Sequence, residues 1–299
     1  AELEVPAQVI EGRTMVPVRF VSEALGANVS WDQAAKTVVV TFEEKRDGMT
    51  PEELMLKCNE AMQKYNTYKF KGNAEIKVSA QEAPEDFSTN MTIDGSYRKT
   101  GDKAEVYVKE TVEIPGIEGS TPDSMNVEVY TDGINIYQRM TGSDWQKIEL
   151  SADLMQLMQN QDPQKALQMM KDLGLILTHG NEVKIDGKDH YTLMVKIDAE
   201  KYLQFMKDIL AKAAPANQPA QVAGEKVDFT QIFDELLKNM SIDMSEKVYI
   251  AKDTYLMTKA ELNGRIMMSI LGQAITEDMH MEWTVSDYGA DVTMPDVTK

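Results

Sequence analysis

From residue 68 onwards, apolar and polar residues alternate along much of the chain. In Met279–Val285, every odd-numbered residue is apolar and every even-numbered residue is polar. This period of two is typical of a β-strand with one buried face and one face in water. The alternation recurs in nine further stretches, at residues 70–78, 87–97, 106–114, 125–129, 134–136, 191–197, 247–250, 255–262 and 266–271. We therefore predict one large antiparallel sheet of about ten strands, with Met279–Val285 as its closing strand.

Helical spacing of apolar residues interrupts this pattern between blocks of strands. It predicts three helices, at Ser151–Leu173 with a break near Pro163, at Ala199–Ala213 and at Phe229–Met240. A further helix is expected before the first strand, because Thr50, Pro51 and Glu53 form a capping box with proline in the first turn. A sheet of this size must curl, and its apolar face must be covered. We expect an α+β domain at residues 50–299, in which helices cover a large curled antiparallel sheet that forms an open half-barrel.

The first 45 residues predict a separate small βαββ module, joined to the larger domain by the charged linker Glu43–Gly48. Gly26 follows the expected helix as its C-terminal cap. The expected elements are strands at Val5–Ile10 and Met15–Val18, a helix at Arg19–Leu25, and a hairpin of Val29–Trp31 with Thr37–Phe42.

Four motifs in this module occur together, at residues 11–19 (EGRTMVPVR), 22–27 (SEALGA), 29–32 (VSWD) and 36–40 (KTVVV). In these motifs the segment resembles the copper amine oxidase N-terminal-like domain, an extracellular module of Gram-positive bacteria, in an abbreviated form. The resemblance implies a surface appendage, so a cell-wall or protein partner is expected through residues 1–43. Arg13 and Arg19 either bind an anionic partner or pair with neighbouring acidic residues. Copper is not implied, because residues 1–57 contain no His or Cys to bind it.

Charge and composition exclude several classes of function. The net charge is -18, from 31 basic and 49 acidic residues, which disfavours nucleic acids and anionic membrane surfaces as partners. No apolar run approaches the roughly 20 residues of a transmembrane helix. The single cysteine, Cys58, forms no intramolecular disulfide. The first residues have no signal-peptide pattern, so the chain is either cytosolic or its export signal and any lipid anchor lie outside the sequence shown.

No catalytic or metal-binding motif is present. The three histidines, His179, His190 and His280, have no spacing suited to a metal, and His280 is expected in solvent. Nucleophile, phosphate-binding and dinucleotide-binding motifs are absent from the sequence. We therefore expect no cofactor, no metal and no enzymatic activity.

Motifs in the larger domain occur in a characteristic order: residues 130–137 (YTDGINIY) with Trp145, 186–191 (DGKDHY), 248–255 (VYIAKDTY) and 286–295. In this order the domain resembles the LolA-type lipoprotein-carrier fold and its mycobacterial relatives. The resemblance implies an apolar cavity for an acyl chain or another hydrophobic ligand. The alternation makes nine residues the cavity candidates: Val106, Val108, Val127, Val129, Ile136, Leu193, Val195, Met281 and Trp283.

Two interpretations of these nine residues remain open. They either line a cavity, where the 21 methionines would suit an adaptable binding surface, or they pack against the helices as a filled core. The first predicts a secreted or cell-surface protein that binds a lipid. The second predicts a cell-wall or protein interaction scaffold without a ligand.

Overall fold

The structure is a computed structural model of the chain. It describes residues 7–10, 13–80, 86–101, 103–114, 123–148, 162–213, 220–222, 225–227, 237–270 and 273–298. The chain divides into two compact units, Ala1–Pro51 and Glu52–Lys299. Each unit is described by itself below.

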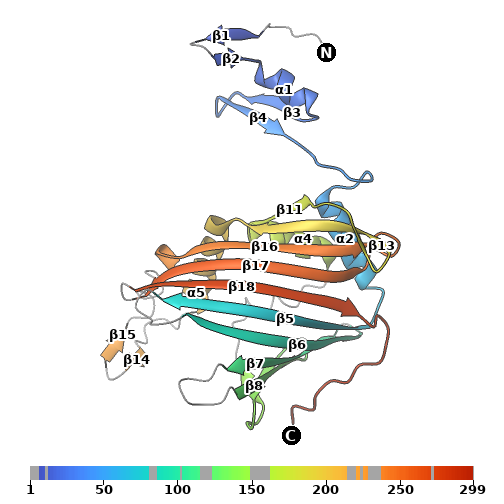
Figure 1. The fold of residues 1–299 in the computed structure, drawn as a ribbon, viewed down its shortest axis with the longest axis vertical. Coiled ribbons are helices and arrows are strands. Elements are labelled where there is room, and N and C mark those ends of the chain that lie inside the picture. The colour runs from blue at the N-terminus through green and yellow to red at the C-terminus, as the bar shows by residue number, and fades with distance from the viewer. Residues whose placement is uncertain are drawn as a thin grey trace. The chain divides into compact units, whose positions relative to one another are not determined.

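The smaller unit contains two separate two-stranded sheets with a helix between them (Figure 1). Its elements are β1 (Gln8–Ile10), β2 (Arg13–Met15), α1 (Val18–Ala24), β3 (Asn28–Asp32) and β4 (Thr37–Thr41). The structure does not confirm the predicted βαββ module, because β1 and β2 form a hairpin of their own. The strand expected at Met15–Val18 ends at Met15, and Pro17 is the N-cap of α1. Proline is favoured at the start of a helix because its fixed φ suits this position.

Between residues 7 and 48, no described side chain is buried. The β3–β4 hairpin is closed by Asp32, whose Oδ1 accepts hydrogen bonds from the backbone N–H groups of Ala34 and Ala35, both at 2.9 Å. The register places Trp31 opposite Val38 and Val29 opposite Val40, so these apolar residues share one face of the hairpin. Trp31 and Val40 remain 53% and 46% exposed. The described residues from 7 to 48 therefore form an apolar surface and contribute no buried side chain.

The larger unit is built on a 12-stranded antiparallel sheet that is not closed, as the sequence predicts in outline (Figure 1). The strand order is β10-β9-β8-β7-β6-β5-β18-β17-β16-β13-β11, and β12 also pairs with β13. The strands are β5 (Thr67–Ala80), β6 (Phe87–Thr100), β7 (Lys103–Ile114), β8 (Asp123–Thr131), β9 (Ile136–Met140), β10 (Gln146–Ile148), β11 (Leu175–His179), β12 (Val183–Ile185), β13 (Lys188–Ile197), β16 (Ser241–Ala251), β17 (Met257–Ile270) and β18 (Gln273–Ser286). A separate pair, β14 (Ala220–Val222) and β15 (Glu225–Val227), completes the strands described.

Strand β18, which contains the alternating stretch Met279–Val285, lies in the interior of the sheet. It pairs with β17 on one side and with β5 on the other, so it joins the C-terminal strands to the first strand of the unit. It is therefore not an edge strand. The predicted alternation is confirmed, because His280 and Thr284 are exposed whereas Val285 is buried.

Three helices of the larger unit, α2 (Pro51–Met62), α4 (Pro163–Asp172) and α5 (Ala199–Ala213), lie on one side of the sheet (Figure 1). Asp162 caps α4, since its Oδ1 accepts hydrogen bonds from the backbone N–H groups of Gln164 and Lys165. The part of the first predicted helix at residues 151–161, and most of the one at Phe229–Met240, fall outside the described residues. The sequence did not predict β11, because Leu175, Ile176 and Leu177 are all apolar and conceal its alternation.

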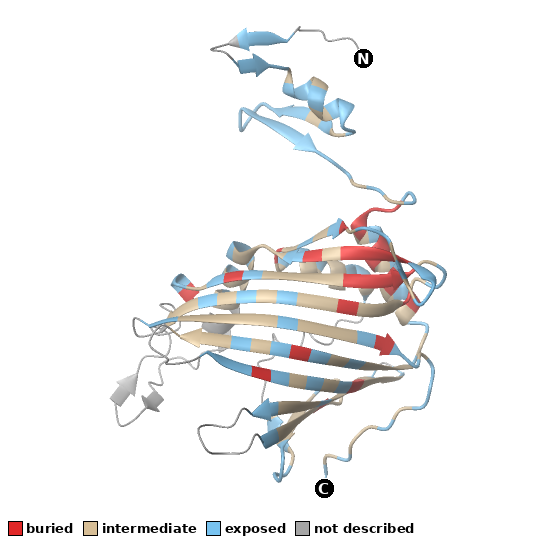
Figure 2. Ribbon diagram, viewed as in Figure 1, coloured by how far each residue is buried: buried red, intermediate tan, exposed pale blue. Residues whose placement is uncertain are grey.

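The buried core is concentrated near one end of the sheet, around α2, β13, β16 and β17. Leu54 of α2 is fully buried, and so are Leu193, Ile250 and Ala260 of the three strands. Figure 2 shows the buried residues gathered in this region, while β6, β7 and β8 carry mainly partly buried and exposed residues.

Candidate functional site

The strand registers place all nine candidate residues on the same face of the large sheet. Between β7 and β8, Val108 lies opposite Val129 and Val106 lies opposite Thr131. Thr131 in turn lies opposite Ile136 of β9. One further row runs from Leu193 through Val248 and Ala260 to Trp283, and another from Val195 through Glu246 and Leu262 to Met281. The row of Trp283 continues through Gly72, Ile93 and Glu110 to Val127. We call this side of the sheet the apolar face.

The apolar face has a closed part and an open part. The closed part consists of Leu193, Val195, Val248, Ile250 and Ala260, each no more than 4% exposed. The open part consists of the other seven candidates, all of which are only partly buried: Val106, Val108, Val127, Val129, Ile136, Met281 and Trp283. The structure therefore separates the nine candidates, since Leu193 and Val195 belong to the packed core.

Helix α2 closes the end of the sheet near β13, β16 and β17. Cys58 of this helix is 1% exposed, and burial raises the pKa of its thiol to about 12. An aromatic cluster lies beside it: the Tyr68 and Tyr97 rings stack with centroids 4.6 Å apart, and the Tyr288 hydroxyl donates to the carbonyl of Met257 at 2.6 Å. Burial raises the pKa of Tyr68 and of Tyr288. These groups are held as neutral, structural side chains.

Glu110 and Glu246 are carboxylates on the apolar face that were not identified from the sequence. Glu110 of β7 lies between Ile93 and Val127, and Glu246 of β16 lies between Val195 and Leu262. Burial raises the pKa of both groups. The alternation itself contained the signal, because Glu110 occupies the same parity as Val106, Val108 and Val112.

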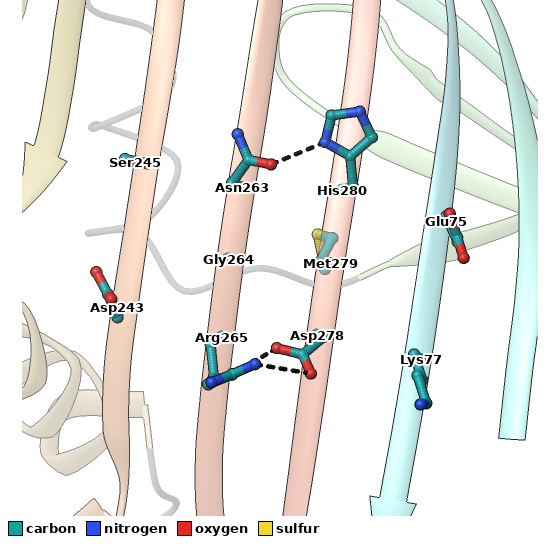
Figure 3. Close-up of a pocket in the computed structure, with 10 residues that line it drawn as sticks. All are labelled: Glu75, Lys77, Asp243, Ser245, Asn263, Gly264, Arg265, Asp278, Met279 and His280. Carbon is teal, nitrogen blue, oxygen red and sulfur yellow. Dashed lines mark hydrogen bonds and ion pairs between the residues drawn. The ribbon is translucent and has the colours of Figure 1, made fainter. Parts of the chain in front are cut away.

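The opposite face of the sheet is polar and carries a shallow open hollow of about 440 Å³ (Figure 3). Arg265 binds Asp278 through two hydrogen bonds of 2.6 and 3.2 Å and lowers the pKa of that carboxyl group. His280 is exposed here, as predicted, and its Nδ1 lies 2.8 Å from the Asn263 side-chain oxygen.

A second hollow of about 410 Å³ lies on the same face between Lys71 and Lys259, and Trp283 borders it. The charged side chains around these two hollows pair with one another across neighbouring strands, and their reactive groups do not converge on a common point.

The other two histidines are buried. His190 is 2% exposed, and its Nδ1 lies 2.9 Å from the carbonyl of Lys188, so this nitrogen must carry the proton. His179 lies on β11, opposite Leu193. Among the residues that the structure describes, no group of three or more His, Cys, Asp or Glu side chains is arranged to hold a metal ion. No described helix is both long enough and apolar enough to cross a membrane.

Comparisons with known proteins identify one family and several distant structures. Residues 50–297 match the model of a family of unknown function, DUF6612. The comparison with curated proteins finds no match.

Three solved structures are similar at low identity. LprF from Mycobacterium bovis shares 10% identity at a TM-score of 0.35, covering 83% of this chain and 96% of that one. The lipoprotein LppX from Mycobacterium tuberculosis shares 12% at a TM-score of 0.37, covering 82% and 98%. A putative outer membrane lipoprotein-sorting protein domain from Vibrio parahaemolyticus shares 10% at a TM-score of 0.27, covering 81% and 95%. At these values the likenesses say nothing about a ligand or an activity.

Proposed function

The chain belongs to the DUF6612 family, and we propose that it is a non-enzymatic secreted or cell-surface protein that binds a hydrophobic ligand. The ligand lies against the open part of the apolar face, under helices that cover the sheet as an open half-barrel. The observation that carries this proposal is the contrast within one face, where Val248 and Ala260 are buried but Val108 and Val129 are not.

An apolar surface that stays partly open is costly in water. Burying it contributes roughly 25 cal/mol per Å², and contiguous exposed apolar patches beyond a few hundred Å² are typical of binding sites. The open part is continuous across neighbouring strands, because Met91, Ile93, Val112 and Met125 fill the positions between the candidates on the same face. Methionine side chains adapt to irregular apolar shapes. This composition suits an alkyl or acyl chain of variable form.

The proposal can be tested with N-phenyl-1-naphthylamine, an uncharged apolar dye that fluoresces when it leaves water. The wild-type chain should bind the dye saturably, and the Val129→Asp variant should lose binding because a charged side chain would replace an apolar one at the centre of the open part. The matched control is Thr92→Asp on β6, which adds the same charge to the exposed polar face. Circular dichroism would establish that both variants fold. Absence of saturable binding to the wild type, or unchanged binding by Val129→Asp, would contradict the proposal.

A second candidate function is attachment to a cell-wall or protein partner through residues 1–43. The apolar face of the β3–β4 hairpin favours it, because Trp31 and Val40 are exposed there together with Phe42 at 63%. Arg19 lies 3.7 Å from Glu23, which favours the pairing interpretation for this arginine over an anionic partner. Retention on cell-wall pellets should be lost in a Trp31→Ser, Val40→Ser variant and kept in a Val9→Ser control. Equal retention of both variants would rule out this surface.

A further inference from the structure

Glu110 and Glu246 of the apolar face lie among side chains that offer them no partner. Glu110 has Ile93 and Val127 beside it on the neighbouring strands, and Val108 and Val112 on either side along β7. A carboxylate in such surroundings loses hydration without gaining a hydrogen bond, which is unfavourable unless another group supplies one.

Glu246 has the same kind of surroundings in the closed part. Val195 and Leu262 lie beside it, and Met244 and Val248 flank it along β16. Neither Glu246 nor Glu110 makes a hydrogen bond or an ion pair with another residue in the described part of the chain. About five strand spacings, or roughly 24 Å along the sheet, separate the two carboxylates, so each acts alone.

The polar face treats its acidic residues differently. Glu105 lies 2.7 Å from Arg98, Glu128 lies 3.0 Å from Arg139, and Asp278 lies 2.6 Å from Arg265. On the apolar face, by contrast, no Lys or Arg of β5, β7, β8, β16, β17 or β18 projects, as the registers show. On these strands the apolar face therefore presents no cation. Its partly buried carboxylates include Glu110, which has valines on either side, and Glu277, which lies opposite Val78 and Ile266, six residues along β18 from the row of Trp283 and Glu110. The neighbouring β6 places one lysine on this face, Lys99, near the end of the strand and six residues from Ile93.

We propose that Glu110 binds the head group of the hydrophobic ligand, and that this head group is a hydrogen-bond donor without negative charge, a hydroxyl or an ammonium group. This inference rests on the proposed function, because it specifies the ligand of the same face. A hydroxyl or ammonium group donates to the carboxylate, and hydrogen bonds to an ionised acceptor are stronger than neutral ones. A carboxylate or phosphate head group would meet like charge in a poorly hydrated site, where repulsion is least screened.

The test compares three ligands with the same 18-carbon chain: oleyl alcohol, oleylamine and oleate. Each displaces N-phenyl-1-naphthylamine from the wild-type chain at pH 7. The alcohol and the amine should bind about tenfold more tightly than oleate, which is the size of one hydrogen bond to a charged group. The Glu110→Gln variant should lose most of this preference. Glu113→Gln should keep it, because Glu113 lies on the same strand but is exposed and accepts a 3.0 Å hydrogen bond from Asn90.

A second variant, Glu110→Val, continues the valines on either side and should abolish the preference in the same way if Glu110→Gln folds poorly. Oleate binding to the wild type as tightly as oleylamine would overturn the inference, and so would a preference that survives both Glu110 variants. In either case the proposed function would stand, because all three ligands still bind. Failure of the dye and of every ligand to bind would instead overturn the proposed function itself.

Discussion

Replacing Val248 by alanine should destabilise the larger unit far more than replacing Val129 by alanine. The two residues lie on the same face of the same sheet, and each change removes the same two methyl groups. Val248 is 4% exposed in the closed part, whereas Val129 is only partly buried in the open part. The pair therefore measures whether the two parts of the apolar face are packed differently.

The magnitude follows from the burial of each side chain. Two buried methyl groups contribute about 1.6 kcal/mol of transfer free energy, and the space left behind in a packed core adds to this, so Val248→Ala should cost about 2 to 3 kcal/mol. In the open part, water or ligand reaches the site, and Val129→Ala should cost less than about 1 kcal/mol. If both valines were core residues, the two substitutions would cost the same free energy of unfolding.

Urea denaturation of protein freed of bound lipid, followed by tryptophan fluorescence and circular dichroism, gives both values. The midpoint should fall clearly for Val248→Ala and barely for Val129→Ala, with the slope of the transition unchanged in both. Equal losses of 2 to 3 kcal/mol would refute the reasoning, because they would show that the helices pack the open part as tightly as the closed part.

Three further predictions follow from individual contacts. Arg98 lowers the pKa of the buried Glu105 carboxyl group below its ordinary 4.5 by a hydrogen bond, and Tyr130 donates to it as well. The stabilisation is therefore present above pH 4.5 and is lost as the pH falls through the lowered pKa, so Glu105→Gln should destabilise the chain in urea at pH 7, and this difference should shrink as the pH falls below 4.5. Gly72→Ala should lower the free energy of unfolding by about 1 to 3 kcal/mol, because an added Cβ would lie 2.5 Å from the carbonyl oxygen of Glu282. Thermal unfolding measures this loss, with Asn73→Ala as the control. An unchanged midpoint for Gly72→Ala would contradict the prediction and show that β18 can shift. Cys58, buried and with its pKa raised to about 12, should not react with a maleimide at pH 7 in the folded chain but should react fully in urea; rapid native labelling, read by mass spectrometry, would contradict the placement of α2.

The local elements of the fold could be predicted because each depends on neighbouring residues. The turns at Asp132-Gly133 and Asp186-Gly187 form as expected, with both glycines at positive φ. Helix α5 has the bounds expected for it, and α2 begins at Pro51. Alternation also assigned His280 to the exposed face. In each case, turn chemistry, capping or period two decides the outcome.

What the sequence could not show depends on contacts between distant residues. A period of two says which residues share a face, but it does not say which strands are neighbours. The pairing of β18 with β5 and the strand β11 therefore appeared only in the structure. The division of the nine candidates into buried and partly buried residues also depends on distant contacts. Leu193 and Val108 have equivalent sequence patterns but different burial. Glu110 was visible in the pattern as a polar residue at an apolar position.

Native mass spectrometry of the purified chain, followed by organic extraction, tests the central claim most directly. The apolar face should retain a hydrophobic ligand, so the spectrum should contain a species heavier than the 33.6 kDa chain, and the extract should contain a molecule that rebinds to the emptied protein. A spectrum showing only the bare chain, together with an emptied protein that takes up neither N-phenyl-1-naphthylamine nor oleyl alcohol, would contradict the claim.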